Sequence, residues 1–209
     1  MTKILFICHG NICRSTMAEY IFKDMIKKRG LENQYECDSA ATSREEIGNP
    51  IYPPAAKKLA EKGVPYGDHR ARQVTRDDYD RYDILFVMDD NNRRNLMRII
   101  GEDSECKVRL LLPGRSIADP WYTGDFESTY QDLILGLEAF WEETKEEVIY
   151  MSEKDRKLTQ EELEKVTGGD LRYDWRDYGE GNNTDVDRAN IQKEIDETIA
   201  QIDANALNK

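Results

Sequence analysis

Residues 4–15 read Ile4-Leu5-Phe6-Ile7-Cys8-His9-Gly10-Asn11-Ile12-Cys13-Arg14-Ser15. The apolar run at the start of this stretch predicts a buried strand that delivers Cys8 to a turn. Gly10 allows the backbone to curl, and the next residues open an amphipathic helix whose N-terminal N–H groups face the turn. The stretch therefore predicts an anion cradle with a thiol at its centre.

The rest of the first 150 residues alternates between apolar strands and helical patterns. This alternation predicts an α/β fold, a doubly wound four-stranded parallel sheet flanked by helices, with the cradle after the first strand. The predicted strands cover residues 3–8, 35–40, 84–88 and 108–112. The predicted helices cover about 14–29 (ended by Gly30), 53–63, 90–100 and 127–150, the last burying Leu133, Leu137, Phe140 and Trp141.

Composition excludes several classes of protein. A net charge of −12 over 209 residues argues against nucleic acid and anionic membranes as partners. The apolar run that ends at Cys8 is too short for a signal peptide or a membrane span. The four cysteines show no disulfide-framework spacing and no zinc-site pattern. We therefore expect a cytoplasmic protein without a metal or another cofactor.

The residue types around the cradle suit covalent phosphoryl transfer. A helix N-terminus beside an arginine favours the thiolate form of Cys8, which is the nucleophile. The planar guanidinium of Arg14 suits two phosphate oxygens, and Ser15 is placed to hydrogen-bond the sulfur. Asp119 follows the fourth strand, at the same sheet edge as Cys8. We expect Asp119 to protonate the leaving oxygen and then to activate water.

Two motifs in this order resemble the low-molecular-weight protein tyrosine phosphatases. They are Cys-His-Gly-Asn-Ile-Cys-Arg-Ser at residues 8–15 and Asp119-Pro120 followed by aromatic residues, and the resemblance covers about residues 1–150. It implies hydrolysis of phosphotyrosine in a protein substrate, and of small aryl phosphates, through a cysteinyl-phosphate intermediate. The catalytic residues would be Cys8, Arg14 and Asp119. The substrate would be bound by His9, Gly10, Asn11, Ile12, Cys13, Ser15, Trp121 and Tyr122.

The resemblance also implies supporting roles for residues around the loop. Asn11, Ser15, Ser39 and His69 would form a hydrogen-bond network that holds the loop in its strained shape. Cys13 would form a reversible disulfide with Cys8 and so protect the thiolate from irreversible oxidation. Taken without the resemblance, two alternatives stay open: Cys13 as an inert packing residue, and His69 as a surface histidine.

Departures from the family pattern bear on the substrate. Ala41 stands where the family usually has glycine, and the loop at Glu45 lacks the usual aromatic residue. Trp121 replaces a tyrosine but can still flank a phenyl ring. Ile12 favours phosphotyrosine over phosphoarginine, because relatives that hydrolyse phosphoarginine tend to have threonine there.

Three alternatives to a tyrosine phosphatase remain on this fold. One is a phosphoarginine phosphatase. Another is an arsenate reductase, which is disfavoured because residues 88–100 contain no further cysteine. A phosphate-binding module without activity would be expected to lose Cys8, Arg14 or Asp119, and all three are present.

Residues 151–209 lie outside the family pattern and form an acidic extension. They contain nine basic and fifteen acidic residues. We expect a short capped helix from Thr159 to Gly168-Gly169, although the same residues also resemble a double-glycine leader. A linker would follow at about 170–184. A second helix at about 185–207 would carry an isoleucine stripe suited to self-association or to docking on a partner.

Overall fold

The apolar run at the start of the chain forms a central strand of the sheet. In the computed structural model, which describes residues 1–145, β1 (Thr2–Cys8) lies between β2 (Tyr35–Ala41) and β3 (Ile84–Val87). β4 (Val108–Leu110) pairs with β3 and completes the order β2-β1-β3-β4. All three pairings are parallel, which confirms the predicted four-stranded parallel sheet.

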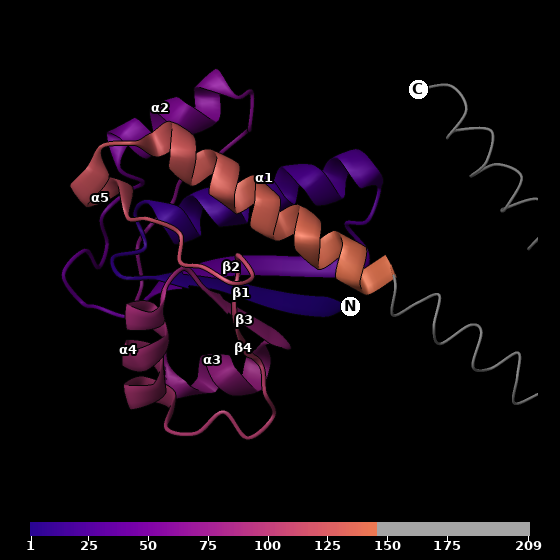
Figure 1. Ribbon diagram of the computed structural model, residues 1–209, viewed down its shortest axis with the longest axis vertical. Helices are drawn as coiled ribbons and strands as arrows, with labels where there is room; N and C mark the ends of the chain where they lie inside the picture. The colour runs from indigo at the N-terminus through magenta and orange to yellow at the C-terminus, as the bar shows by residue number, and fades with distance from the viewer. Residues whose placement is uncertain (146–209) are drawn as a thin grey trace, which may run out of the picture. The chain divides into compact units, whose positions relative to one another are not determined.

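Helices cover both faces of this sheet (Figure 1). α1 (Arg14–Arg29), α2 (Pro53–Glu61) and the helix at 126–145 pack on one face. α3 (Arg76–Arg81) and α4 (Asp90–Ile100) pack on the other. The first face buries the larger core, which includes Phe6, Phe22, Phe86 and all four predicted residues of the last helix, Leu133, Leu137, Phe140 and Trp141. The doubly wound arrangement is therefore confirmed.

The C-terminus of α1 follows its sequence signals. Its last turn carries Lys27, Lys28 and Arg29, whose charges suit the negative end of the helix dipole. Gly30 then adopts a left-handed conformation with φ of 68°, and its N–H donates to the carbonyl of Lys27 at 3.2 Å. A side chain would be strained there, so glycine ends the helix as predicted.

Several element boundaries differ from the prediction. β3 and β4 stop one and two residues early, because the backbone after them turns toward the loops at the carboxyl edge of the sheet. The last helix begins at residue 126 rather than 127. α3 and the single turn α5 (Pro120–Thr123) were not predicted. Both are too short to show a helical period, and α3 relies on a capping box between Thr75 and Asp78.

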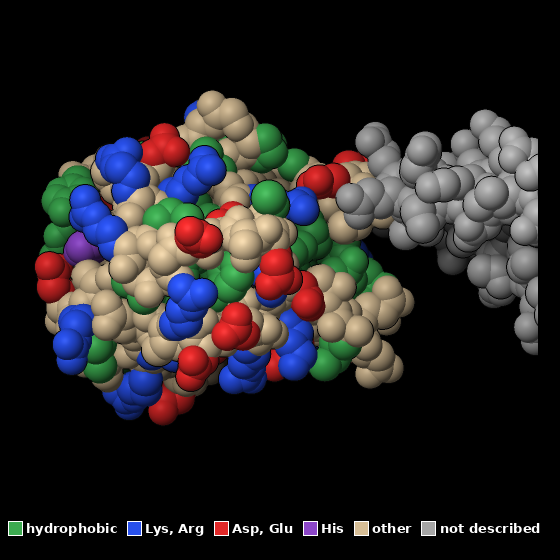
Figure 2. Space-filling model, turned by 90° about the horizontal axis from the view of Figure 1, so that it is seen from below, with side chains coloured by type: hydrophobic (Ala, Val, Ile, Leu, Met, Phe, Trp, Pro, Cys, Tyr) green, Lys and Arg blue, Asp and Glu red, His purple; other side chains and the backbone are tan. Residues whose placement is uncertain are grey.

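Residues 146–209 lie outside the described part of the chain. The predicted capped helix near Thr159, the linker at about 170–184 and the helix at about 185–207 all fall there and stay predictions. None of the helices within residues 1–145 is long and apolar enough to cross a membrane. On the face that carries α3 and α4, basic and acidic side chains are interspersed rather than separated into broad patches (Figure 2).

We predict that Gly136→Ala destabilises the domain even though alanine favours helices. A Cβ at Gly136 would lie 2.6 Å from the carbonyl oxygen of Leu111, just after β4. We expect the free energy of unfolding to fall by about 1–3 kcal/mol, as for other overpacked sites. Urea denaturation measures it, with Leu135→Ala as the exposed control on the same helix. If the free energy of unfolding instead rises by about 1 kcal/mol, as helix propensity alone predicts, then Leu111 moves aside without an energetic penalty and the prediction is wrong.

Candidate active site

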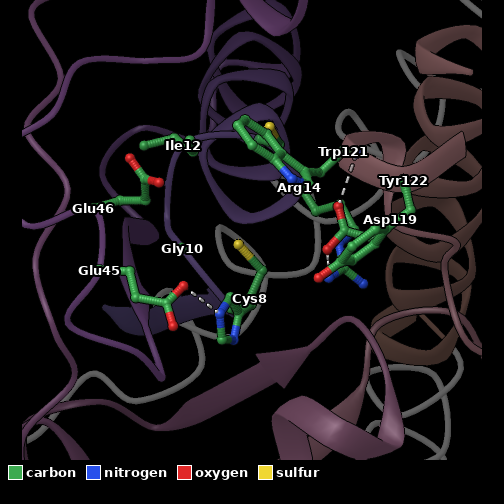
Figure 3. A pocket seen from close by; sticks show the side chains of 11 residues that line it. Cys8, Gly10, Ile12, Arg14, Glu45, Glu46, Asp119, Trp121 and Tyr122 are labelled. Atoms are coloured by element: carbon green, nitrogen blue, oxygen red, sulfur yellow. Dashed lines mark hydrogen bonds and ion pairs between the residues drawn. The ribbon is translucent and has the colours of Figure 1, made fainter. Parts of the chain in front are cut away.

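The loop that joins β1 to α1 wraps around the sulfur of Cys8 (Figure 3). Cys8 is the last residue of β1 and is almost completely buried. The backbone N–H of Asn11 lies 3.3 Å from the Cys8 sulfur, and the hydroxyl of Ser15 lies 3.1 Å from it. Asn11 has φ of 57°, in the left-handed region, so the loop can turn back toward the sulfur. The result is a ring of backbone around a thiol.

The guanidinium of Arg14 is buried beside this ring and paired on two sides. It donates to a carboxylate oxygen of Asp89 at 2.6 Å, to one of Asp119 at 2.6 Å and to the carbonyl of Ile117 at 3.0 Å. Burial would lower the pKa of Arg14, but the negative charges of Cys8, Asp119 and Asp89 outweigh it and raise that pKa. Its Nε is buried without a hydrogen-bond partner in residues 1–145, which leaves a donor for a bound anion.

Asp119 reaches the site from the loop that follows β4. It caps the N-terminus of α5, where one carboxylate oxygen accepts from the backbone N–H of Trp121 at 3.1 Å. The other oxygen pairs with Arg14. Two contacts therefore fix the carboxyl group, and residues 105 positions apart in the sequence meet over one cavity.

Aromatic side chains border the cavity over Cys8 on one side only. Trp121 packs on Tyr52, with 5.0 Å between ring centres, and is 54% exposed, whereas Tyr122 is 83% exposed. Trp121 is therefore the better fixed of the two rings. Residues 1–145 contain no group of three or more side chains placed to hold a metal ion. The cavity is lined by Cys8, His9, Gly10, Ile12, Cys13, Arg14, Glu45, Glu46, Asp119, Trp121 and Tyr122.

Cys13 lines the same cavity but has a different chemical character. It is buried, and both it and Cys8 are free thiols. Burial raises the pKa of Cys13 far above the usual value for a thiol, and the negative charges of Cys8 and Asp119 raise it further. Cys13 is therefore a neutral thiol at physiological pH.

A buried hydrogen-bond network holds the loop from behind. The Asn11 amide donates to Ser39 at 2.8 Å and to Ser15 at 3.1 Å. The ring of His69 lies 2.6 Å from the Asn11 carbonyl oxygen and 3.2 Å from the Thr16 hydroxyl. The structure thus brings together the residues for which a supporting role was expected, and Ser15 joins the network to the Cys8 sulfur.

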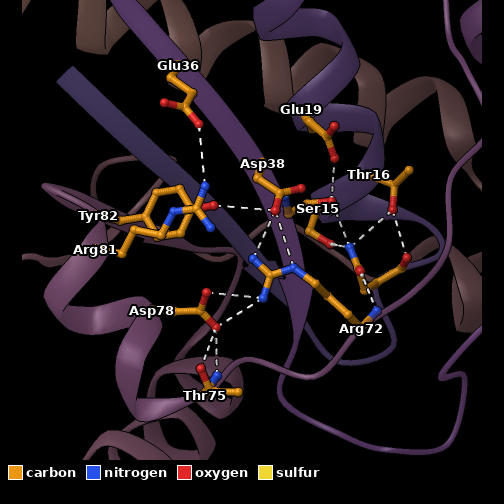
Figure 4. A network of polar contacts seen from close by, with 12 residues as sticks. Ser15, Thr16, Glu19, Glu36, Asp38, Arg72, Thr75, Asp78, Arg81 and Tyr82 are labelled. Atoms are coloured by element: carbon orange, nitrogen blue, oxygen red, sulfur yellow. Dashed lines mark hydrogen bonds and ion pairs between the residues drawn. The ribbon is translucent and has the colours of Figure 1, made fainter. Parts of the chain in front are cut away.

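A charged cluster extends this network toward α3 (Figure 4). The backbone N–H of Arg72 donates to the Asn11 side-chain oxygen at 3.1 Å. Its guanidinium pairs with Asp38 at 2.9 Å and with Asp78 at 3.0 Å. Tyr82 donates to the same Asp38 carboxylate at 3.3 Å. The position of the loop is therefore tied to β2 and to the capping box of α3.

Sequence reasoning assigned no role to four residues of this site. Asp89 follows β3 at the carboxyl edge of the sheet, so its place in the topology was a usable signal. Glu19 accepts from Ser39 at 2.6 Å, Thr16 donates to the Asn11 carbonyl at 2.8 Å, and Arg72 is described above. Arg72 lies in a stretch, residues 69–73, that shares the resemblance to the family, but neither spacing nor residue type indicated its partners or a role for Glu19 or Thr16.

Comparison with known proteins identifies the family. Residues 3–150 match the family model described as low molecular weight phosphotyrosine protein phosphatase. The chain belongs to this family. A low molecular weight phosphotyrosine protein phosphatase from Gallus gallus is 38% identical over 148 residues, which cover 66% of this chain and 93% of the relative.

Solved structures of the low molecular weight phosphatases share the fold. The crystal structure of YfkJ from Bacillus subtilis matches with a TM-score of 0.67 at 35% identity, over 70% of this chain and 96% of that one. A Drosophila arginine phosphatase matches with a TM-score of 0.64 at 29% identity, over 69% and 98% of the two chains. The fold alone therefore does not distinguish a tyrosine from an arginine phosphatase.

We predict that the charged cluster behind the loop makes stability depend on pH. Burial would raise the pKa of Asp38, but the N–H of Ser39 and the charge of Arg72 outweigh it and lower that pKa. The ionised carboxylate thus stabilises the fold above its unfolded pKa of about 4, and this is lost as pH falls through the lower folded value. We expect Asp38→Asn to cost about 1 kcal/mol at pH 7, since water screens this half-exposed pair.

Urea denaturation at pH 7 and at pH 3 measures this effect. The difference between the wild type and Asp38→Asn should shrink at the lower pH. Asp80→Asn, at an exposed position of α3, is the matched control and should change stability little at either pH. An unchanged difference at pH 3 would contradict the assigned role of the carboxylate.

Proposed function

We propose that this phosphatase hydrolyses phosphotyrosine in protein substrates, and small aryl phosphates, through a cysteinyl-phosphate intermediate. One observation carries the proposal. The sulfur of Cys8 lies inside a loop whose N–H groups and helix N-terminus suit an anion, and Arg14 and Asp119 converge on the same cavity. A nucleophile, a cation for the transferred phosphoryl group and an acid are the three parts that this chemistry needs.

In the first step the Cys8 thiolate attacks phosphorus and the bond to the tyrosyl oxygen breaks. Asp119 gives its proton to that oxygen, so that a neutral phenol leaves. Arg14 and the loop N–H groups stabilise the charge of the phosphoryl oxygens in the transition state.

In the second step water attacks the phosphorus of the cysteinyl phosphate. Asp119, now ionised, takes a proton from the water, and the sulfur–phosphorus bond breaks to release inorganic phosphate and the Cys8 thiolate. Ser15 donates a hydrogen bond to the departing sulfur, from which its oxygen is 3.1 Å distant. The same carboxyl group thus serves as acid and then as base.

The aromatic side of the cavity favours phosphotyrosine over phosphoarginine. Trp121 offers a ring face to a phenyl group, and Ile12 lines the cavity without a hydrogen-bonding group for a guanidinium. Hydrolysis of matched phosphotyrosine and phosphoarginine peptides decides between the two substrates. We also place the enzyme in the cytoplasm, because a nucleophilic thiol has to stay reduced.

We predict that Cys8→Ser reduces turnover of phosphotyrosine peptide to background, because a serine hydroxyl at this site lacks the thiolate's nucleophilicity. Asp119→Asn should lower kcat by about 10²- to 10⁴-fold, since it removes the proton donor. The loss should be smaller for p-nitrophenyl phosphate, whose leaving group needs no proton. Equal losses on both substrates would contradict the role of Asp119 as an acid.

We predict that the two thiols of the cavity respond differently to substitution. Because burial and neighbouring negative charges raise the pKa of Cys13, it stays a neutral thiol and takes no part in attack. Cys13→Ala should therefore keep kcat within about tenfold of the wild type, whereas Cys8→Ser loses it. Iodoacetate labelling followed by mass spectrometry should modify Cys8 before Cys13. Preferential labelling of Cys13 would reverse the assignment.

A further inference from the structure

The side of the cavity opposite the aromatic rings is formed by two carboxylates. Glu45 and Glu46 come from the loop that follows β2, and Trp121 and Tyr122 come from α5 (Figure 3). All four side chains line the cavity that contains Cys8. A substrate that places its phosphate on Cys8 therefore passes between an aromatic side and an acidic side.

Local contacts hold both carboxylates at this mouth. Glu45 lies 3.1 Å from the ring of His9, the residue that follows the nucleophile. Glu46 accepts from the side-chain amide of Asn49 at 2.6 Å. The Glu46 side chain also covers Gly10, where an added Cβ would lie 3.2 Å from its Cγ. The acidic side is thus fixed against the phosphate-binding loop itself.

Among the described residues, no lysine or arginine is paired with Glu45 or Glu46, so both carboxylates are available to a ligand. Arg14 is the one lysine or arginine that lines the cavity, and it is buried between Asp89 and Asp119. Arg44 is exposed and does not line the cavity. Within residues 1–145, the His9 ring is the one side chain paired with the Glu45 carboxylate, and Glu46 is held by a neutral amide. Glu45 is 72% exposed, so an incoming positive charge can reach it.

We propose that Glu45 and Glu46 select phosphotyrosine substrates that carry a lysine or arginine directly beside the phosphotyrosine. A dianion that enters an acidic mouth meets repulsion, and a neighbouring cation in the substrate offsets it through contact with these carboxylates. The inference rests on the proposed function and adds a substrate class to it. The preference for these substrates should be modest, because the contact between the cation and the carboxylates is partly exposed to water.

Matched peptides test this inference in the wild-type enzyme. The same phosphotyrosine is flanked on both sides by arginine, by glutamine or by glutamate, and kcat/KM is measured for each peptide. We expect arginine to exceed glutamine, and glutamine to exceed glutamate, by about fivefold at each step in 20 mM salt. The differences should shrink at 0.5 M salt, where exposed charges are screened.

Variants assign the preference to the two carboxylates. In Glu45→Gln/Glu46→Gln the ratio between the arginine and glutamate peptides should fall to within about twofold, and in Glu45→Lys/Glu46→Lys it should invert. Glu32→Gln removes one negative charge from an exposed position at the opposite end of the sheet, shortly before β2 begins, and should keep the wild-type ratio.

The outcomes separate this inference from the proposed function. If no phosphotyrosine peptide is hydrolysed, the proposed function fails and the inference fails with it. If all peptides are hydrolysed at equal rates, the function stands and the inference is overturned. It is also overturned if the double glutamine variant keeps the preference for arginine, because another part of the surface then recognises the cation.

Discussion

The backbone of Asn11 is the constraint on which the rest of the site depends. A residue with a side chain in the left-handed region costs about 1–2 kcal/mol, and Asn11 occupies this region at the centre of the loop. Its buried amide offsets the cost through hydrogen bonds to Ser39, Ser15 and the backbone of Arg72. Without that conformation, its N–H would not point at the Cys8 sulfur.

The network around Asn11 explains why distant parts of the chain are needed for one short loop. Asn11 contacts β2 through Ser39, and it contacts the segment before α3 through His69 and Arg72. An unsatisfied buried polar group costs about 1–3 kcal/mol, so each partner holds the others in place. A strained backbone conformation persists only where several independent contacts hold it, and the contacts of Asn11 meet that condition.

Much of this arrangement could be predicted from the sequence, because the responsible patterns lie within single strands and helices or follow from the topology of a parallel sheet. The run before Cys8 and the basic turn before Gly30 act locally, so β1 and α1 were predicted closely. Asp119 could be placed because a parallel sheet gathers the ends of its strands at one edge. The helices α3 and α5 are too short to show a period.

The contacts of Glu19, Thr16 and Arg72 could not be predicted from the sequence, for a different reason. Thr16 and Arg72 bind Asn11 of the loop, and Glu19 binds Ser39 behind it, so these contacts form only after folding and spacing does not reveal them in advance. The same holds for Glu45 and Glu46 at the entrance of the cavity. The sequence showed that an aromatic residue was missing near Glu45, but only the folded loop places Glu45 against His9 and Glu46 over Gly10.

The charges beside Cys8 show how a dianion is bound in a site that is not positive overall. Arg14 carries one positive charge, and Asp89 and Asp119 together carry two negative charges when both are ionised. With the thiolate added, the sum is unfavourable to phosphate, so a single arginine cannot account for binding. The backbone N–H groups of the loop and the first turn of α1 supply the remaining attraction, because their dipoles converge without any counter-charge of their own. This makes the shape of the loop, more than the net charge, the property that decides binding. The two paired carboxylates also have a role in this site, because together they orient the guanidinium of Arg14.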